Sequence, residues 1–401
     1  MNESLPRRPG RFAAVLALVL LAGILPAAGQ EISLDELIAR ARKRDADAEY
    51  MLGMRAYAGY GVPRDPSQAL RLVQRAAQRG HLEAQNTYGY FLQHGVGTKP
   101  DPERARPWYE AAAGRGHALA QINLGWLYEH GEGVERSPAI ALEWYRKAAA
   151  QGRAEAELNA GHLLETGTPP DYAAAAAAYV RATRQGLALA HDRLGHLIEA
   201  ERISRSEYGS ALGHYLTAAR ADIPDAQVAV ARLELAAGGA ENARDAVQWL
   251  ERAAKQGHAP AQKLLGDAKT QYRIAHELSA RPPAGEPEAF AWLQRAADQG
   301  LPDAQLRLGI ALEEGRGTAP DPVRAASWYE KAADAGEAEA VYRLALLYDQ
   351  GVGVAKDTVR ARDLFGQAAG QGHERAKERL KTLLGLPSPP APGPDFFKGP
   401  R

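Results

Sequence analysis

The sequence contains no cysteine, which excludes disulfides, thiolate metal sites, cysteine nucleophiles and an acylated N-terminal cysteine. It also has no excess of charge, because 49 Lys and Arg residues balance 49 Asp and Glu residues. No strongly basic block lies outside the extreme N-terminus, so the chain lacks the charge pattern of a nucleic-acid-binding protein. With 45% hydrophobic residues, most of the chain can bury enough apolar surface to fold.

The motifs of common catalytic sites are missing as well. There is no H-E-x-x-H zinc pair, no G-x-x-x-x-G-K-[ST] phosphate loop and no G-x-S-x-G nucleophile elbow. Carboxylates recur at regular intervals along the chain, in Glu129, Glu165 and Glu199. This regular recurrence predicts a rim of solvated side chains rather than a catalytic pair. We therefore expect no catalytic residue, no metal site and no cofactor.

Long hydrophobic runs are absent except at the N-terminus. Three arginines at positions 7, 8 and 11 precede a 14-residue apolar run from Phe12 to Leu25, and small residues follow it. This pattern predicts a signal peptide over residues 1–29 and hence a periplasmic or secreted protein. The run is shorter than the ~20 residues of a membrane span. An uncleaved N-terminus that tethers the protein to the inner membrane is the alternative.

What the sequence does contain is a repeat. Hexapeptides that begin with alanine, and most of which end with glycine, recur along the chain: AEYMLG at Ala48, AQNTYG at Ala84, AQINLG at Ala120, AELNAG at Ala156, AHDRLG at Ala190, AQVAVA at Ala226, AQKLLG at Ala261, AQLRLG at Ala304 and AVYRLA at Ala340. Their spacings are 36, 36, 36, 34, 36, 35, 43 and 36 residues. A period in this range indicates stacked supersecondary units rather than separate domains.

Each unit has the pattern of two helices. Ala120, Leu124, Leu127 and Tyr128 form one apolar stripe at helical period. The glycines of GEGV at 131–134 end this helix, since glycine tolerates the left-handed backbone of a C-cap. The second helix begins at Asp-Pro or Ser-Pro, where the first residue caps free N–H groups and proline lacks the donor that would stay unpaired. We expect the histidines that follow the last glycine of a unit to lie in turns: His81, His117, His258 and His373.

The combined pattern A-x-x-x-L-G-x-x-Y-x-x-G-x-G-V and D-x-x-x-A-x-x-W-Y-x-K-A-A-x-x-G resembles the Sel1-like repeat, a relative of the tetratricopeptide repeat. The resemblance covers about residues 46–385 and is strong where pairs such as Trp108-Tyr109 and Trp328-Tyr329 occur. It weakens over 198–288, where we expect a longer connection between the two helices of the unit at Ala261. The resemblance implies an all-α, right-handed superhelical solenoid of antiparallel helix pairs.

The predicted organisation is a signal peptide (1–29), an N-terminal capping helix (30–45), a solenoid of about nine units (46–385) and a tail (386–401). Ser33 and Glu36 form a capping-box pattern before the first helix. The tail holds six prolines in 16 residues, a composition typical of disorder.

In solenoids, stacked first helices commonly line a concave surface that holds a partner. One outward row of the first four units is rich in aromatic and apolar residues, and we predict that it forms a partner-binding groove of Tyr50, Met54, Tyr90, Ile122, Trp126, Leu158 and His162. The alternative is that these side chains pack against the neighbouring first helix. We therefore expect a protein-interaction scaffold of the bacterial cell envelope that binds a protein or peptide partner. A membrane-tethered regulator of a sensor or secretion system, and a cell-wall or β-lactam hydrolase, are the alternatives.

Overall fold

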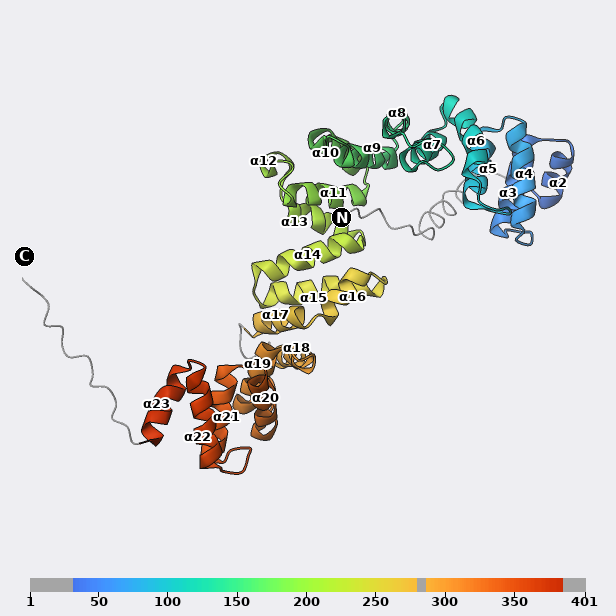
Figure 1. The fold of residues 1–401 in the computed structure, drawn as a ribbon. Helices are drawn as coiled ribbons and strands as arrows, with labels where there is room; N and C mark the ends of the chain where they lie inside the picture. The colour runs from blue at the N-terminus through green and yellow to red at the C-terminus, as the bar shows by residue number, and fades with distance from the viewer. Residues whose placement is uncertain (1–31, 280–285, 385–401) are drawn as a thin grey trace, which may run out of the picture. The chain divides into compact units, whose positions relative to one another are not determined.

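The computed structural model describes residues 32–279 and 286–384. The predicted signal peptide and the predicted tail lie outside these residues. The chain divides into two compact units, Met1–Gly209 and Ser210–Arg401, and each is described by itself. The described residues form α-helices joined by short turns (Figure 1).

In the first unit, four antiparallel helix pairs follow a short N-terminal helix. Its helices are α2 (Leu34–Arg42), α3 (Ala46–Ala58), α4 (Pro66–Gln78), α5 (Leu82–His94), α6 (Pro102–Gly114), α7 (Ala118–His130), α8 (Pro138–Ala149), α9 (Ala154–Thr166), α10 (Tyr172–Arg184), α11 (Ala188–Glu199) and α12 (Arg205–Tyr208). The pairs are α3/α4, α5/α6, α7/α8 and α9/α10. We call the first helix of each pair its A helix and the second its B helix.

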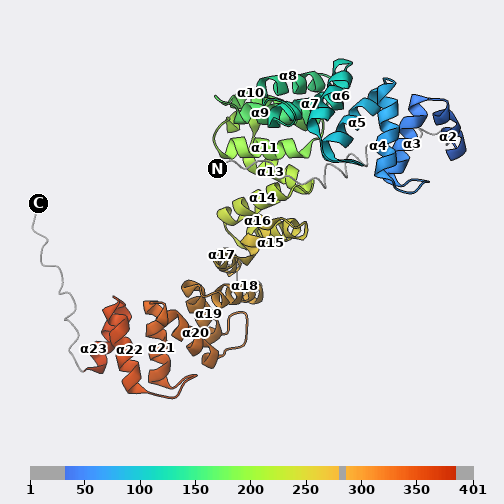
Figure 2. The same ribbon diagram turned by 45° about the vertical axis from the view of Figure 1, so that its right-hand side comes forward.

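The second unit is built in the same way. Its helices are α13 (Ala211–Arg220), α14 (Pro224–Ala237), α15 (Ala240–Lys255), α16 (Ala259–Gly266), α17 (Ala268–Leu278), α18 (Glu286–Asp298), α19 (Pro302–Glu314), α20 (Pro322–Asp334), α21 (Ala338–Gln350), α22 (Thr358–Gly370) and α23 (Glu374–Leu383). The pairs are α14/α15, α17/α18, α19/α20 and α21/α22. From α19 to α23 the helices lie side by side in chain order in both views (Figure 2). The all-α solenoid of helix pairs is confirmed.

The turn between the A and B helices explains why two glycines are needed there. Gly131 adopts a φ of 72° and its N–H donates to the Leu127 carbonyl, which ends α7. Gly133 also has a positive φ, and a Cβ on it would lie 2.5 Å from the backbone nitrogen of Glu103, in the first turn of α6. The first glycine therefore ends the helix, and the second lets the turn pack against the B helix of the preceding pair.

A tyrosine on the B helix joins the two helices of a pair, and we call this contact the tyrosine lock. The Tyr145 side chain is 0% exposed, and a Cβ on Gly125 would lie 2.8 Å from its ring. Its hydroxyl donates to Glu129 at 2.7 Å. The same three positions are occupied in other pairs by Tyr109, Gly89 and Gln93, by Tyr179, Gly161 and Glu165, and by Tyr329, Gly309 and Glu313. Glycine at this A-helix position makes room for the ring.

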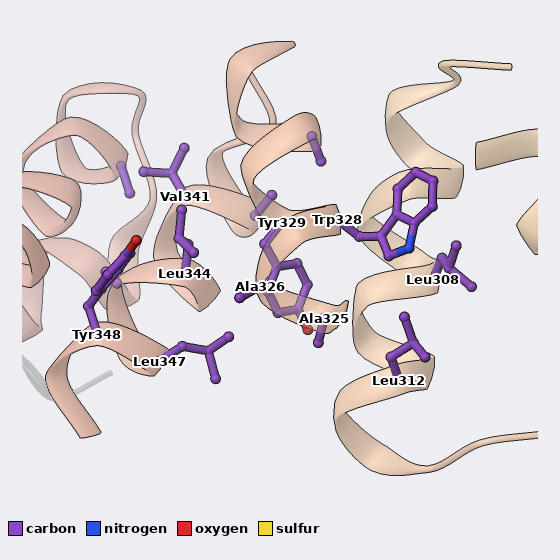
Figure 3. Close-up of a cluster of buried hydrophobic side chains, with 14 of the residues drawn as sticks. Leu308, Leu312, Ala325, Ala326, Trp328, Tyr329, Val341, Leu344, Leu347 and Tyr348 are labelled. Atoms are coloured by element: carbon purple, nitrogen blue, oxygen red, sulfur yellow. The ribbon is translucent and has the colours of Figure 1, made fainter. Parts of the chain in front are cut away.

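Figure 3 shows this packing around the pair α19/α20. Tyr329 and Trp328 of α20 lie beside Leu308 and Leu312 of α19, and residues of α21 lie on the other side of α20. Trp328 is 7% exposed and Tyr329 is 0% exposed. Each B helix is thus covered on both sides by A helices, which is why one pair alone cannot bury its apolar surface.

The side chains of buried glutamines join successive helix pairs, because each donates a hydrogen bond to a backbone carbonyl of the preceding pair. The Gln121 amide donates to the Ala113 carbonyl at the end of α6 at 3.1 Å and accepts from Gln151 at 2.8 Å. Gln227 makes the equivalent pair of bonds, to the Ala219 carbonyl and from Gln256. These side chains satisfy carbonyls that the end of a helix leaves without an intrahelical partner.

The histidines after the last glycine of a unit are N-caps of A helices. Nδ1 of His117 accepts the Ala120 N–H at 3.1 Å, and its Nε2 lies 2.9 Å from a carboxylate oxygen of Glu83 in the preceding A helix. This hydrogen bond lowers the pKa of Glu83 from its ordinary value. His81 and His373 cap their helices in the same way. The prediction that these histidines belong to turns is therefore refined, because the side chains of His81, His117 and His373 also cap the first turn of the next helix.

Replacing His117 by alanine is expected to lower the free energy of unfolding by about 0.5–2 kcal/mol, the usual cost of losing an N-cap side chain. Chemical unfolding followed by circular dichroism measures this difference. His258→Ala is the matched control, because His258 occupies the same position and makes no side-chain cap hydrogen bond. Equal losses in the two variants would contradict a capping role for His117.

The predicted register of the repeat that starts at Ala261 is wrong. The segment AQKLLG lies in α16, a short extra helix, and α17 is the A helix that pairs with α18. Gln271 of α17 accepts from Gln299, as Gln121 accepts from Gln151, whereas the carbonyl at the end of the preceding B helix accepts from Gln262 of α16. The spacing of 43 residues therefore records the insertion of α16 before the pair, not a longer connection within it.

Candidate binding face on the A helices

Consecutive A helices of the first unit lie against each other. Tyr50 of α3 and Thr87 of α5 share a hydrogen bond of 3.3 Å between their hydroxyl oxygens. The Asn123 amide of α7 donates to the Asn86 carbonyl oxygen of α5 at 2.9 Å. The A helices α3, α5, α7 and α9 thus present one row of side chains, and the predicted groove residues belong to this row.

Tyr50 is half-buried on this row. Its ring lies 4.7 Å from the ring of His81, the N-cap of the next A helix. Burial raises the pKa of its hydroxyl to about 12, against a smaller opposite effect of the hydrogen bond with Thr87. Tyr50 is therefore a neutral phenol whose ring is partly covered by the neighbouring helix.

The prediction for Met54 is wrong. Its side chain is only 1% exposed and belongs to the same buried cluster as Phe91 and Leu92 of α5. The flexible thioether side chain fills space inside the core. Met54 therefore cannot contact a partner, and the candidate face consists of Tyr50, Tyr90, Ile122, Trp126, Leu158 and His162. We call these six residues the A-helix face.

Two aromatic residues of the A-helix face are stacked on histidines one turn later. The rings of Tyr90 and His94 lie 4.1 Å apart at 25°, and those of Trp126 and His130 lie 4.2 Å apart at 20°. Nδ1 of each histidine also lies about 3 Å from the backbone carbonyl oxygen of the stacked residue. The histidines hold the aromatic rings in one orientation. Sequence analysis missed this role, although the aromatic-to-histidine spacing of four residues was a visible signal.

The three remaining residues extend the face to α7 and α9. Ile122 and Leu158 are half-buried and pack on the core clusters beneath them. His162 is half-buried, and burial lowers the pKa of its imidazole from the ordinary value. Its buried Nδ1 has no hydrogen-bond partner among the described residues. His162 is thus a neutral ring with unused hydrogen-bonding capacity on the face.

The prediction of a solvated carboxylate rim is wrong for Glu129 and Glu165. Both are half-buried and accept the hydroxyl hydrogen bonds of Tyr145 and Tyr179, at 2.7 and 2.6 Å. These carboxylates belong to the tyrosine lock. They are neither a rim exposed to solvent nor a pair that shares a substrate.

Within residues 32–279 and 286–384, no group of three or more His, Cys, Asp or Glu side chains is arranged to hold a metal ion. In the same part of the chain, no helix has the length and hydrophobicity that crossing a membrane requires.

Comparison with known proteins identifies the repeat. The Sel1 repeat model matches eight segments: residues 46–81, 82–117, 118–152, 154–187, 224–258, 268–301, 302–337 and 338–373. The segment 268–301 begins at α17, in agreement with the register above. No curated protein matches the chain.

Two solved structures are similar along most of their length. One is a protective antigen of uropathogenic Escherichia coli strains that displays an SLR fold, with 24% identity, a TM-score of 0.48 and coverage of 88% of this chain and 90% of that chain. The other is a Sel1 repeat protein from Oxalobacter formigenes, with 27% identity, a TM-score of 0.39 and coverage of 91% and 99%. Because the family model matches more than half of the sequence, the chain belongs to the Sel1 repeat family.

Proposed function

We propose that this protein is an interaction scaffold of the bacterial cell envelope that holds a segment of a partner protein on the A-helix face. The scaffold role in this proposal rests on the family, because stacked helical repeats commonly act as binding surfaces for other proteins. The proposed location, periplasmic or secreted, rests on the N-terminal sequence pattern. Tethering through an uncleaved N-terminus remains the alternative form of the same scaffold.

The observation that carries the proposal is the pair of stacked rings, Tyr90 with His94 and Trp126 with His130. Tyrosine and tryptophan dominate binding energy at protein interfaces because they bury a large area at a low cost in conformational entropy. Here the stacking fixes both rings before a partner arrives, so less entropy is lost on binding. The proposal includes no catalytic step.

The test replaces both rings, as Tyr90→Ser with Trp126→Ser, in the protein used to capture partners from envelope extract. A partner identified by mass spectrometry is then purified and its affinity measured directly. We expect the double variant to lose at least tenfold in affinity, since hot-spot residues contribute about 2 kcal/mol or more each. Its thermal unfolding should stay close to that of the wild type.

The control changes two tryptophans of the B helices, as Trp108→Ser with Trp144→Ser. Both are half-buried in the same repeats, so they match the loss of aromatic surface. Retained binding in this control, with lost binding in the A-helix variant, supports the proposal. An A-helix variant that binds as well as the wild type would refute it, and so would one that loses binding only because it unfolds.

A further inference from the structure

The second unit contains a hollow of about 170 Å³ between α17, α18 and α19. Its walls are apolar, and charged residues stand at its edge. The side chains that line it include Tyr272, Ala275, Phe290, Leu293, Arg307 and Ile310. All of them belong to the second unit.

The hollow lies where the tyrosine lock is missing. Gln271 and Gln305 hold the same position in the repeat segments 268–301 and 302–337, which places Ala275 at the glycine position of the lock. Leu293 follows Trp292 and so takes the place of the tyrosine. Ser279 stands where the other pairs have the glutamate or glutamine acceptor. Ala275, Leu293 and Ser279 all line the hollow. In this pair, the leucine at the tyrosine position lies beside space that a ring occupies in the pairs with the lock.

The walls remain only partly covered by the protein itself. Tyr272, Phe290, Leu293 and Ile310 are half-buried and pack on the core cluster of this unit. Ala311 lines the base, and its carbonyl accepts the Arg316 N–H at the end of α19. This bond holds Arg316 at the edge of the hollow.

The lining carries charges of both signs. Arg307 makes no hydrogen bond and no ion pair with any part of the chain that the structure describes. Arg316 is paired with Glu314. Glu286 is the acidic residue of the lining. Among the described residues, Arg307 is thus the cation of the lining without an ion pair, and Glu286 is an unpaired carboxylate of the same lining.

We propose that this hollow binds an aromatic side chain of a partner peptide in which an aspartate or glutamate stands next to the aromatic residue. A cavity of about 150 Å³ is enough to hold benzene, so the hollow accommodates one aromatic ring. The neighbouring carboxylate pairs with Arg307, whose planar guanidinium binds carboxylates through two parallel hydrogen bonds. Ring and carboxylate together match the apolar walls and the free cation.

The probes are three blocked dipeptides, Ac-Asp-Phe-NH2, Ac-Lys-Phe-NH2 and Ac-Asp-Ala-NH2, titrated into the full chain by ligand-observed NMR. We expect Ac-Asp-Phe-NH2 to bind with a dissociation constant of about 0.1–1 mM, a reasonable range for a ligand of this size. The other two should bind at least tenfold more weakly, because each lacks either the carboxylate or the ring. Equal affinity for all three would overturn the proposal.

Two variants locate the binding. Arg307→Gln is expected to weaken Ac-Asp-Phe-NH2 about tenfold, the effect of losing a charge-assisted hydrogen bond. Arg362→Gln is its control, because Arg362 is an exposed arginine of α22 that does not line the hollow. The double variant Ala275→Gly with Leu293→Tyr rebuilds the tyrosine lock and fills the hollow. It should fold with an unchanged thermal midpoint and bind no dipeptide.

Binding that survives in the folded double variant would overturn the proposal, and so would equal losses in Arg307→Gln and Arg362→Gln. The chain itself carries an aspartate followed by two phenylalanines at 395–397. The last experiment therefore measures dipeptide affinity after removal of residues 386–401. We expect unchanged affinity, whereas tighter dipeptide binding would make the chain's own segment the occupant and overturn the assignment to a partner.

Discussion

Replacing Tyr145 by alanine is expected to lower the free energy of unfolding by about 3–5 kcal/mol, the range for deleting a large buried aromatic side chain. The ring is fully buried between α7 and α8, and its hydroxyl donates to Glu129. The variant leaves a cavity and also removes the hydrogen bond of a half-buried carboxylate. Denaturant unfolding followed by circular dichroism measures the loss. Ile140→Ala, at an exposed position of the same helix, is the control and should change stability little.

The lock also predicts a coupling between its two ends. Gly125→Ala alone should cost about 1–3 kcal/mol, because the new Cβ would overlap the Tyr145 ring. In the variant Gly125→Ala with Tyr145→Leu, the added methyl group meets a smaller side chain, and the second change should cost less than it does alone. The pair α14/α15 has this combination naturally, with Ala231 opposite Leu250, and both are buried. Additive losses in the double-mutant cycle would show that the two positions do not interact.

The lock also shows how far the sequence predicts the fold. Apolar residues at helical period, Asp-Pro starts and glycine ends are local signals, and they predict the helix pairs correctly. In the Trp-Tyr pairs, the more deeply buried ring is that of the tyrosine, and the tryptophan before it is less covered. Trp144 remains half-buried, while Tyr145 is 0% exposed. Periodicity cannot separate these neighbours, because adjacent residues on a helix are only 100° apart.

The errors arise because contacts between helices, and the insertion of a helix, are not visible in the period of the repeat. The helical period places Met54 on an outward row, but its side chain is buried in a cluster that holds residues of both α4 and α5. Glu129 lies near the end of α7 but accepts a hydrogen bond from α8. The register near Ala261 failed because α16 begins with the Ala-containing segment that marks an A helix elsewhere. The A-helix face stays a prediction, since its six residues are half-buried and their contact with a partner depends on a second molecule.

Replacing Glu234 by glutamine is expected to stabilise the second unit at neutral and alkaline pH. Burial, with a contribution from the charge of Asp245, raises the pKa of Glu234 to about 7. Its Oε2 is buried without a hydrogen-bond partner among the described residues. Because the folded state binds this proton more tightly than the unfolded state, the contribution of Glu234 is most favourable below about pH 4.5. It is lost as the pH rises through 7.

The size of this effect follows from about 1.4 kcal/mol for each unit of pKa. Glu234 is only half-buried, so screening by water reduces the full value, and we expect Glu234→Gln to gain about 1–2 kcal/mol at pH 8. The gain should shrink as the pH falls from 7 towards 4.5. Unfolding free energies of variant and wild type, measured in parallel from pH 4 to pH 8, give this difference without the effects of other carboxylates.

Two further variants separate the causes. Asp245→Asn removes the neighbouring negative charge, so it should lower the pKa of Glu234 and give part of the same gain at pH 8. Glu251→Gln, at an exposed position of α15, removes a carboxylate of the same unit and should leave the pH dependence unchanged. If Glu234→Gln and Glu251→Gln gave the same difference from wild type at every pH, the buried Oε2 of Glu234 would carry no cost. In that case the pair α14/α15 would tolerate a charge where the neighbouring pairs have leucine or tyrosine.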